Sequence, residues 1–390
     1  MGKRIGMEVS IAAAEAVKQA NVDVISAYPI TPQTHIVEHL SELVANGDLD
    51  AEFSCVESEH SALSACVGAA ATGARAFTCT SSQGLALMSE ITYIASGMRL
   101  PMVMIIANRT MSAPLSIWND HSDAMSIRDC GWIQFFVENG QEVYDHVFAA
   151  YRLAEDKKVL FPVIINMDGY ILSHVIEPIE LIEQEKIDQF LPPYQPVHRL
   201  HPDHPVTMGA FALPSIFSET KKAQEEALRS SMPKIIDTLK AFGDMTGRHY
   251  HPVETYKSED AETLLVTMGS YGETASVAVD KMREEGKSVG LVKIRLWRPF
   301  PFEAFKKATR HAKQLVVIDR AISTGACGPV ASEVKAALYG EARRPSVYNF
   351  VAGISGRDVT PSDFIKMVDK AEMEIEEGNK EGFEIYGVRG

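Results

Sequence analysis

The stretch "YPITPQT", residues 28–34, follows a short apolar run and holds two prolines immediately before a segment with helical periodicity. The run before it, residues 22–27, is apolar and β-branched, which is typical of a buried strand. After it, Ile36, Leu40 and Leu43 fall on one face of a helix. A strand, a polar turn and a helix in this order predict the first unit of a parallel α/β sheet.

The same alternation continues along the first part of the chain. Further strands are expected at residues 52–56, 76–80, 102–107, 133–137 and 163–167. Helical patterns lie between these runs, for example at residues 8–19, 35–44 and 60–71. This order predicts a doubly wound parallel sheet over residues 1–175.

The rest of the chain divides into an interruption and a second α/β region. Residues 176–260 are rich in prolines and charges, which suits an excursion over the surface or onto another subunit. A helix at residues 218–242 is expected there, and Pro233 should kink or divide it. From residue 261 to 390 a smaller α/β domain is predicted, with strands at residues 263–268, 289–294, 314–319 and 346–351.

Composition narrows the class of protein. A chain of 390 residues exceeds one typical core, so two domains are expected. The net charge of -14, without a compensating basic block, argues against binding nucleic acid. No apolar run is long enough to span a membrane, and the start has no signal-peptide core, so a cytoplasmic protein is expected. The five cysteines include no C-x-x-C, which predicts neither disulfides nor a metal site.

Polar stretches follow four neighbouring strands of the predicted sheet. They are "YPITPQT", "ESEHSA", "SSQG" and "NRTMSAPLSIWNDHSD". Because the carboxyl ends of parallel strands form one edge of the sheet, where ligands bind, these stretches are expected to meet.

Thr31 and Pro32 are expected to begin a helix, with Thr31 as N-cap and Pro32 as the first helical residue. Such a helix start aims free N–H groups into the crevice, which suits an anion. Arg109 could add a guanidinium fork for a carboxylate, or it could form an ion pair with Asp120 or Asp123. The sequence leaves both alternatives open.

Two acidic residues, Glu57 and Glu59, follow the second predicted strand, and their spacing does not choose between them. His60, His121 and Asp123 are expected to be surface or supporting groups rather than catalytic ones.

Taken together, the quoted motifs resemble those of one protein family. "YPITPQT", "ESEHSAL", "TSSQGLALMSE" and "RTMSAPLSIWNDHSDAM" occur in this order, and "LLVTMGSYGETA" and "VGLVKIRLWRPFP" follow in the second region. The chain resembles the alpha subunit of the multi-subunit 2-oxoacid:ferredoxin oxidoreductases, nearest to the pyruvate type. The resemblance implies a domain of the thiamine-diphosphate pyrimidine-binding type, followed by a domain similar to the transketolase C-terminal domain.

The same resemblance implies a reaction and its partners. The reaction is oxidative decarboxylation of pyruvate to acetyl-CoA and carbon dioxide, with thiamine diphosphate as cofactor and coenzyme A as co-substrate. A beta subunit would bind the diphosphate and magnesium. A gamma subunit and a ferredoxin-like delta subunit with 4Fe-4S clusters would complete the complex, which passes electrons to ferredoxin.

Roles for individual residues follow from the matching positions. The resemblance implies that Glu59 hydrogen-bonds the pyrimidine nitrogen of thiamine, and that Thr31 and Arg109 hold the carboxylate and keto oxygen of the substrate. These three are the implied catalytic residues, and Ile30 is the implied further substrate contact. Further positions on the cofactor side are Pro29, Ser82 and Gln83.

Other functions remain open at this point. Relatives that take oxalate carry Arg where this chain has Thr31, so Thr31 favours a substrate with a neutral tail. The complex could act on another 2-oxoacid, such as phenylglyoxylate or another aromatic acid, 2-oxoisovalerate or 2-oxoglutarate. The chain could also be the beta component of a lipoamide-linked dehydrogenase, or a non-catalytic interaction subunit.

Overall fold

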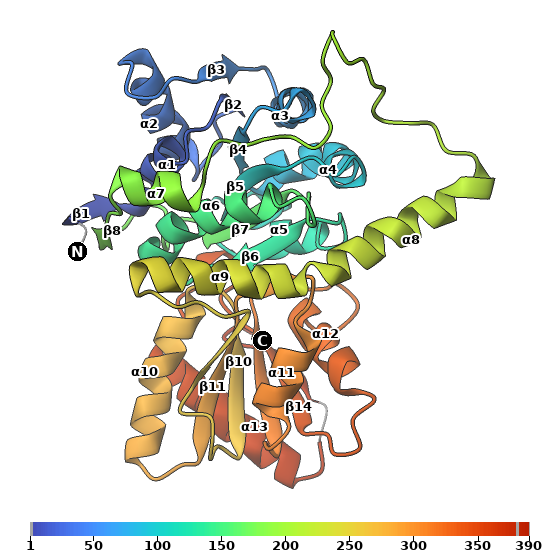
Figure 1. Ribbon diagram of the computed structural model, residues 1–390. Coiled ribbons are helices and arrows are strands. Elements are labelled where there is room, and N and C mark those ends of the chain that lie inside the picture. The colour runs from blue at the N-terminus through green and yellow to red at the C-terminus, as the bar shows by residue number, and fades with distance from the viewer. Residues whose placement is uncertain (1–2, 380–381, 390) are drawn as a thin grey trace.

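The computed structural model describes residues 3–379 and 382–389 and contains two mainly parallel β-sheets with helices on both faces, one above the other in Figure 1. The first sheet has the strand order β12-β6-β7-β5-β4-β2-β3. Its parallel strands are β2 (Val24–Ala27), β3 (Glu52–Cys55), β4 (Ala76–Thr80), β5 (Met102–Asn108), β6 (Ile133–Phe136) and β7 (Val163–Asp168). The predicted doubly wound α/β class is confirmed.

Strand β5 shows why both faces of this sheet are covered. Val103 and Ile105 are buried on one face, while Met104 and Ile106 are buried on the other, as the two-residue period of a strand requires. The first face is covered by α1 (Val9–Gln19), α2 (Thr34–Ala45) and α6 (Gly140–Ala154). The second is covered by α3 (Glu59–Thr72) and α4 (Ser82–Gly97), with the short α5 (Ser122–Ser126) beside α4.

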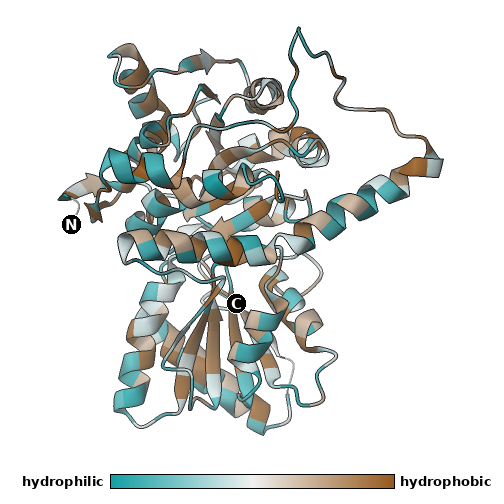
Figure 2. Cartoon of the chain, in the orientation of Figure 1, coloured by the Kyte–Doolittle hydropathy of each residue, from teal (hydrophilic) through white to brown (hydrophobic). Residues whose placement is uncertain are grey.

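The second sheet has the strand order β15-β14-β13-β10-β11-β9. Its strands are β9 (Val253–Tyr256), β10 (Thr263–Thr267), β11 (Val289–Ile294), β13 (Gln314–Asp319), β14 (Ser346–Val351) and β15 (Phe383–Ile385). Helices α10 (Tyr271–Glu284) and α13 (Pro361–Glu376) cover one face, and α11 (Phe302–Thr309) and α12 (Pro329–Leu338) cover the other. Figure 2 shows these strands in the brown of hydrophobic residues, as expected for a sheet that is buried on both sides.

The middle segment mainly returns to the first sheet. Strand β8 (Ile176–Glu180) pairs with β1 (Arg4–Glu8), and α7 (Gln184–Phe190) lies beside α6. The predicted long helix is divided into α8 (Pro214–Ser230) and α9 (Met232–Thr246), which confirms the effect expected of Pro233. Helix α8 extends away from both sheets in Figure 1.

One strand joins the two regions. β12 (Leu296–Arg298) comes from the second region of the chain but pairs antiparallel with β6 at the edge of the first sheet. The sequence did not predict this strand, nor β1, β8, β9 and β15. The second region therefore completes the first sheet in addition to forming its own.

No helix among the described residues combines the length and apolar character needed to cross a bilayer. The five cysteines are free thiols, and Cys66, Cys79 and Cys130 are buried. No group of three or more metal-ligating side chains was found in the described part of the chain.

Candidate active site

The first sheet brings the predicted polar stretches to one edge. Thr31 follows β2 and Arg109 follows β5, and these two strands flank β4 in the sheet. The Nη1 of Arg109 donates a hydrogen bond of 2.9 Å to the carbonyl of Thr31. Two predicted substrate residues, 78 positions apart in the sequence, are therefore in direct contact.

The predicted capping role of Thr31 is wrong. Helix α2 begins at Thr34, its N-cap position is occupied by Gln33, and no side chain caps it. A turn precedes the helix, in which the N–H of Gln33 donates to the carbonyl of Ile30 at 2.9 Å. The ring of Pro32 packs over Gly169 at the end of β7, so that tertiary packing moves the helix start to a later residue. Thr31 contributes to the site through its carbonyl.

Arg109 is held by main-chain oxygens. Its Nε donates to the carbonyl of Ser116 at 2.9 Å, in addition to the bond from Nη1 to Thr31. The ion pair with Asp120 or Asp123, which the sequence left open, does not form among the described residues. The carboxylate of Asp123 bonds the backbone N–H of Arg109 at 3.0 Å and not its guanidinium. Burial lowers the pKa of Arg109, but a guanidinium stays charged at neutral pH. Its remaining N–H groups are left for an anion.

Glu59 is the acidic residue that faces into the site. It is the first residue of α3, whose start is capped by Ser58, and only 6% of its surface is exposed. No described residue donates a hydrogen bond to its carboxylate. A carboxylate that has no partner within the protein is available to hydrogen-bond a ligand. Glu57, in contrast, lies at the surface and accepts a hydrogen bond of 2.5 Å from Ser61, which lowers the pKa of Glu57.

Gly84 makes room for Glu59, a role that no pattern in the sequence indicates. A Cβ atom at position 84 would lie 2.5 Å from Oε1 of Glu59 and 2.6 Å from Oγ1 of Thr80. Only glycine fits at this point of α4 without moving the carboxylate. The packing of α3 against α4 therefore sets the position of the acid.

Ser82 and Gln83 connect the end of β4 to the loop after β5. The hydroxyl of Ser82 donates to the carbonyl of Thr110 at 2.6 Å, and the amide of Gln83 bonds the hydroxyl of Ser112. Of the other predicted residues, Pro29 is exposed and Ile30 is half-buried in the turn before α2.

Asp123 has a larger structural role than the sequence indicated. It is fully buried and accepts from the N–H groups of Ser82 and Arg109, each at 3.0 Å, and from the amide of Asn108 at 3.0 Å. Burial raises the pKa of Asp123 to about 7, although these hydrogen bonds oppose the rise. Asp123 thus ties the ends of β4 and β5 together below the site.

The two histidines near the site, His60 and His121, differ in burial. His60 is at the surface, with Glu90 3.6 Å away, as expected. His121 is buried and its Nε2 lies 2.7 Å from Oδ1 of Asp168, a carboxylate that also pairs with Arg320 of the second region at 2.6 Å. Burial raises the pKa of Asp168, but the positive charge of Arg320 and the hydrogen bonds with His121 and Ser270 outweigh it and hold that pKa far below its usual range. This cluster is a contact between the two sheets.

Polar groups without protein partners gather beside Glu59. Besides the unpaired carboxylate of Glu59, the hydroxyls of Thr80 and Ser81 are buried without hydrogen-bond partners. These groups lie at the end of β4 and at the starts of α3 and α4, and the carboxylate of Glu59 occupies the space that a Cβ of residue 84 would fill. The described residues could therefore hold the pyrimidine ring of a thiamine cofactor.

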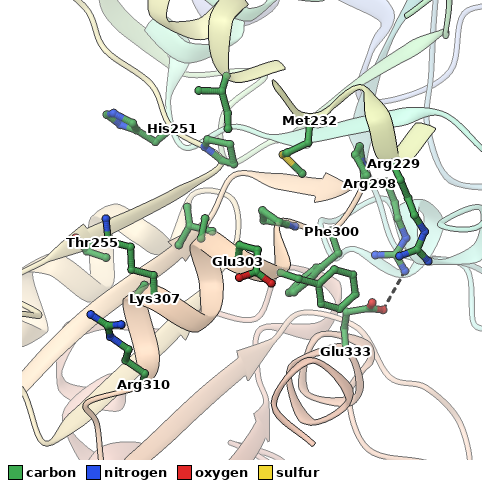
Figure 3. Close-up of a pocket in the computed structure, with 18 of the residues that line it drawn as sticks. Arg229, Met232, His251, Thr255, Arg298, Phe300, Glu303, Lys307, Arg310 and Glu333 are labelled. Carbon is green, nitrogen blue, oxygen red and sulfur yellow. Dashed lines mark hydrogen bonds and ion pairs between the residues drawn. The ribbon is translucent and has the colours of Figure 1, made fainter. Parts of the chain in front are cut away.

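A separate cavity of about 1130 Å³ lies between α9, β9 and α11. Met232 and Phe300 lie in its middle, and Arg298 pairs with Glu333 at 3.0 Å on one side (Figure 3). None of the predicted site residues lines this cavity. The strand-end crevice and this cavity are therefore different places on the molecule.

The fold and the crevice define the class of the protein. Residues 15–240 match the family model "Pyruvate flavodoxin/ferredoxin oxidoreductase, thiamine diP-bdg", and residues 261–364 match "Pyruvate:ferredoxin oxidoreductase core domain II". The chain belongs to this family of thiamine-diphosphate-binding oxidoreductases. The family predicted from the motifs is confirmed.

Individual relatives are similar in sequence to almost the whole chain. The pyruvate synthase subunit PorA of Pyrococcus furiosus is 47% identical over 96% of this chain and 95% of its own length. PorA of Methanothermobacter thermautotrophicus is 48% identical over 93% of both chains. The ketoisovalerate oxidoreductase subunit VorA of Pyrococcus horikoshii is 44% identical over 94% of this chain and 93% of its own.

Two solved structures share the fold. A 2-oxoglutarate:ferredoxin oxidoreductase from Magnetococcus marinus, with 2-oxoglutarate, coenzyme A and succinyl-CoA bound, has a TM-score of 0.69 at 20% identity. The similarity covers 95% of this chain and 65% of that one. A split-gene transketolase has a TM-score of 0.56 at 13% identity, over 95% of this chain and 99% of its own. The transketolase-like architecture is confirmed.

Proposed function

We propose that this chain is the alpha subunit of a pyruvate:ferredoxin oxidoreductase and contributes the pyrimidine side of a thiamine diphosphate site. The observation that carries the proposal is the carboxylate of Glu59, which is buried over Gly84 without a partner among the described residues. In a chain of this family, such a carboxylate is suited to hydrogen-bond a ring nitrogen. The chemistry that thiamine diphosphate supplies when bound is a nucleophilic carbon and an electron sink.

The proposed role of Glu59 is to hold a proton at its carboxylate and share it with the pyrimidine ring. Its low exposure limits the water that competes for this hydrogen bond. Ser82 and Gln83 would border the same ring, with Pro29 at the outer edge of the turn. Glu59 would therefore activate the cofactor and make no contact with the 2-oxoacid.

Arg109 would bind the carboxylate of the 2-oxoacid. Its bonds to the carbonyls of Thr31 and Ser116 fix the plane of the guanidinium. The outward edge, formed by the second N–H of Nη1 and by Nη2, keeps the parallel donors that match a carboxylate. Thr31 and Ile30 would contact the rest of the substrate, with Thr31 beside the keto group.

Pyruvate is the proposed substrate, because the relatives named pyruvate synthase subunits match at 47% and 48% identity. The relative named ketoisovalerate oxidoreductase, at 44%, supports 2-oxoisovalerate as the second candidate. A panel of pyruvate, 2-oxoisovalerate, 2-oxoglutarate and phenylglyoxylate on the reconstituted complex would decide between them by kcat/KM.

The proposal includes the other components of the reaction. A beta subunit would bind the diphosphate and magnesium, and a gamma subunit would complete the complex. A ferredoxin-like delta subunit with 4Fe-4S clusters would carry electrons to ferredoxin. Coenzyme A would accept the acetyl group.

Glu59→Gln in the reconstituted complex tests the central assignment. The amide cannot hold the proton of a carboxyl group, so pyruvate-dependent reduction of ferredoxin should fall about 100-fold or more. Glu57→Gln is the matched control, because Glu57 is an exposed acid two residues away, and it should keep near wild-type turnover. Turnover of Glu59→Gln close to that of the control would refute the assignment.

A further inference from the structure

The loop after β5, residues 110–121, carries the carbonyl that orients Arg109. Ser116, in the middle of this loop, accepts the hydrogen bond from Nε of Arg109 at 2.9 Å. The loop is closed by a bond of 3.0 Å from the N–H of Thr110 to the carbonyl of Trp118. Residues 112–115 are exposed, and Trp118 is 51% exposed. Within the first domain the loop is held at its base by Ser82, which donates to the carbonyl of Thr110, and Trp118 packs against the ring of Tyr170.

A loop of the second domain adds contacts to the middle of this loop. After β14 the chain turns through residues 353–356, and Ser355 donates from its hydroxyl to the hydroxyl of Ser116 at 2.5 Å. The N–H of Gly356 donates to the carbonyl of Asn119 at 2.6 Å. The N–H of Ser355 donates to Oδ2 of Asp120 at 3.3 Å. These three hydrogen bonds, together with the bond of 2.7 Å from the N–H of His121 to the carbonyl of Arg320, join the second domain to the loop that orients Arg109.

Gly356 allows this close approach. Its φ of +71° lies in the left-handed region, which glycine adopts without strain. A Cβ atom at position 356 would lie 2.8 Å from Cβ of Trp118 and 3.6 Å from the backbone nitrogen of Asn119. Any other residue here would push the two loops apart, since the nearest atom belongs to the rigid base of a side chain.

We propose that Ser355 and Gly356 are positioning residues for substrate binding. They hold Ser116 in place, and Ser116 in turn fixes the plane of the Arg109 guanidinium. The second domain then takes part in recognition of the 2-oxoacid, through a contact with the loop rather than with the substrate. The inference rests on the proposed function, in which Arg109 binds the carboxylate of the substrate.

The test measures KM and kcat separately in the reconstituted complex with Gly356→Ala and with Ser355→Ala. We expect KM for the 2-oxoacid to rise about tenfold in Gly356→Ala and less in Ser355→Ala, because the second change removes one hydrogen bond without a clash. In both variants kcat should stay within about twofold of wild type, since the residues do not touch the reacting atoms. Hydrogen exchange of the peptide covering residues 110–121 should become faster.

Gly325→Ala is the control for Gly356→Ala. Gly325 also lies in the second domain with a positive φ of +87°, but a Cβ there would meet nothing within 4 Å. It therefore reproduces the backbone strain without the clash, and KM should not change. If Gly325→Ala raises KM as much as Gly356→Ala, the effect is general destabilisation and the inference is overturned.

Arg109→Ala separates this inference from the proposed function. If Arg109→Ala raises KM while both loop variants leave it within twofold of wild type, the positioning role is wrong and the carboxylate clamp stands. If Arg109→Ala itself leaves KM unchanged, the clamp is wrong and the inference falls with it. A rise of KM in all three variants, with the Gly325→Ala control unchanged, supports both.

Discussion

At the scale of single residues, Gly84 is as important to the site as the acid that it accommodates. We expect Gly84→Ala to displace the Glu59 carboxylate, because the new Cβ would lie 2.5 Å from Oε1. Overpacking of this kind costs about 1–3 kcal/mol of folding free energy. Turnover should fall toward the level of Glu59→Gln, which steady-state reduction of ferredoxin would measure.

Gly68→Ala is the control for this change. Gly68 lies in α3, on the neighbouring helix, and a Cβ there would meet nothing within 4 Å. Alanine should stabilise the helix by about 0.5–1 kcal/mol without changing activity. An active Gly84→Ala variant would show that the position of Glu59 does not limit turnover.

The residues of the site could be predicted only in part from the sequence. The motifs placed Thr31, Glu59 and Arg109 at strand ends, and the structure brings Thr31 and Arg109 into contact. The sequence could not show that Gln33 rather than Thr31 occupies the N-cap position, because the packing of Pro32 over Gly169 overrides the local preference. Gly84 was missed for the same reason, since its close neighbour lies on another helix.

At the scale of elements, Asp319 connects β13 to α12. It is buried at the end of β13 and accepts from the N–H of Val330 at 2.8 Å and of Ala331 at 3.1 Å, at the start of the helix. Burial raises the pKa of Asp319 to about 7, whereas an unfolded Asp titrates near about 3.9. The folded state therefore holds the proton of Asp319 more tightly than the unfolded chain does. The resulting contribution to the free energy of unfolding is complete below the unfolded pKa and is lost as the pH rises through about 7.

Asp319→Asn tests this pH dependence. The variant cannot titrate at this position, so its deficit in melting temperature relative to wild type should be larger at pH 5 than at pH 8. Asp363→Asn is the control, because the pKa of Asp363 is lowered to about 2 by its bond with Thr360 and does not change charge in this range. A deficit for Asp319→Asn that is equal at both pH values would contradict the prediction.

The elements that the sequence predicted share a clear local pattern. The strands of the first parallel sheet are apolar, β-branched runs, and Pro233 is a strong local signal for a helix division. The missed strands β1, β8, β9, β12 and β15 have three to five residues and lie at sheet edges, where they pair with strands that other elements separate from them in the sequence. Their pairing is decided by tertiary packing, which periodicity does not report.

At the scale of the whole molecule, Asp168 joins the two sheets. Its carboxylate accepts from Arg320 at 2.6 Å and from the backbone N–H of Ser270 at 2.9 Å, both in the second region. Arg320 is 2% exposed, so Asp168→Asn would leave a buried guanidinium without its counter-charge. We expect a loss of about 3–5 kcal/mol, seen as a lower melting temperature.

Asp369→Asn is the matched control for this change. Asp369 pairs with Lys287 at the surface, with 49% of its side chain exposed, and its removal should cost at most about 1 kcal/mol. Equal losses in the two variants would mean that Asp168 does not hold the sheets together.

Strand β12 has a consequence for how this chain can be divided. The first family match ends at residue 240 and the second begins at residue 261. A gene divided between them, near residue 260, would encode the two regions as separate chains. The first product would then lack Leu296–Arg298 and expose the backbone of β6 as an open edge, which promotes association with other strands. The two halves are therefore not interchangeable modules, and a recombined hybrid would need β6 and β12 from the same parent.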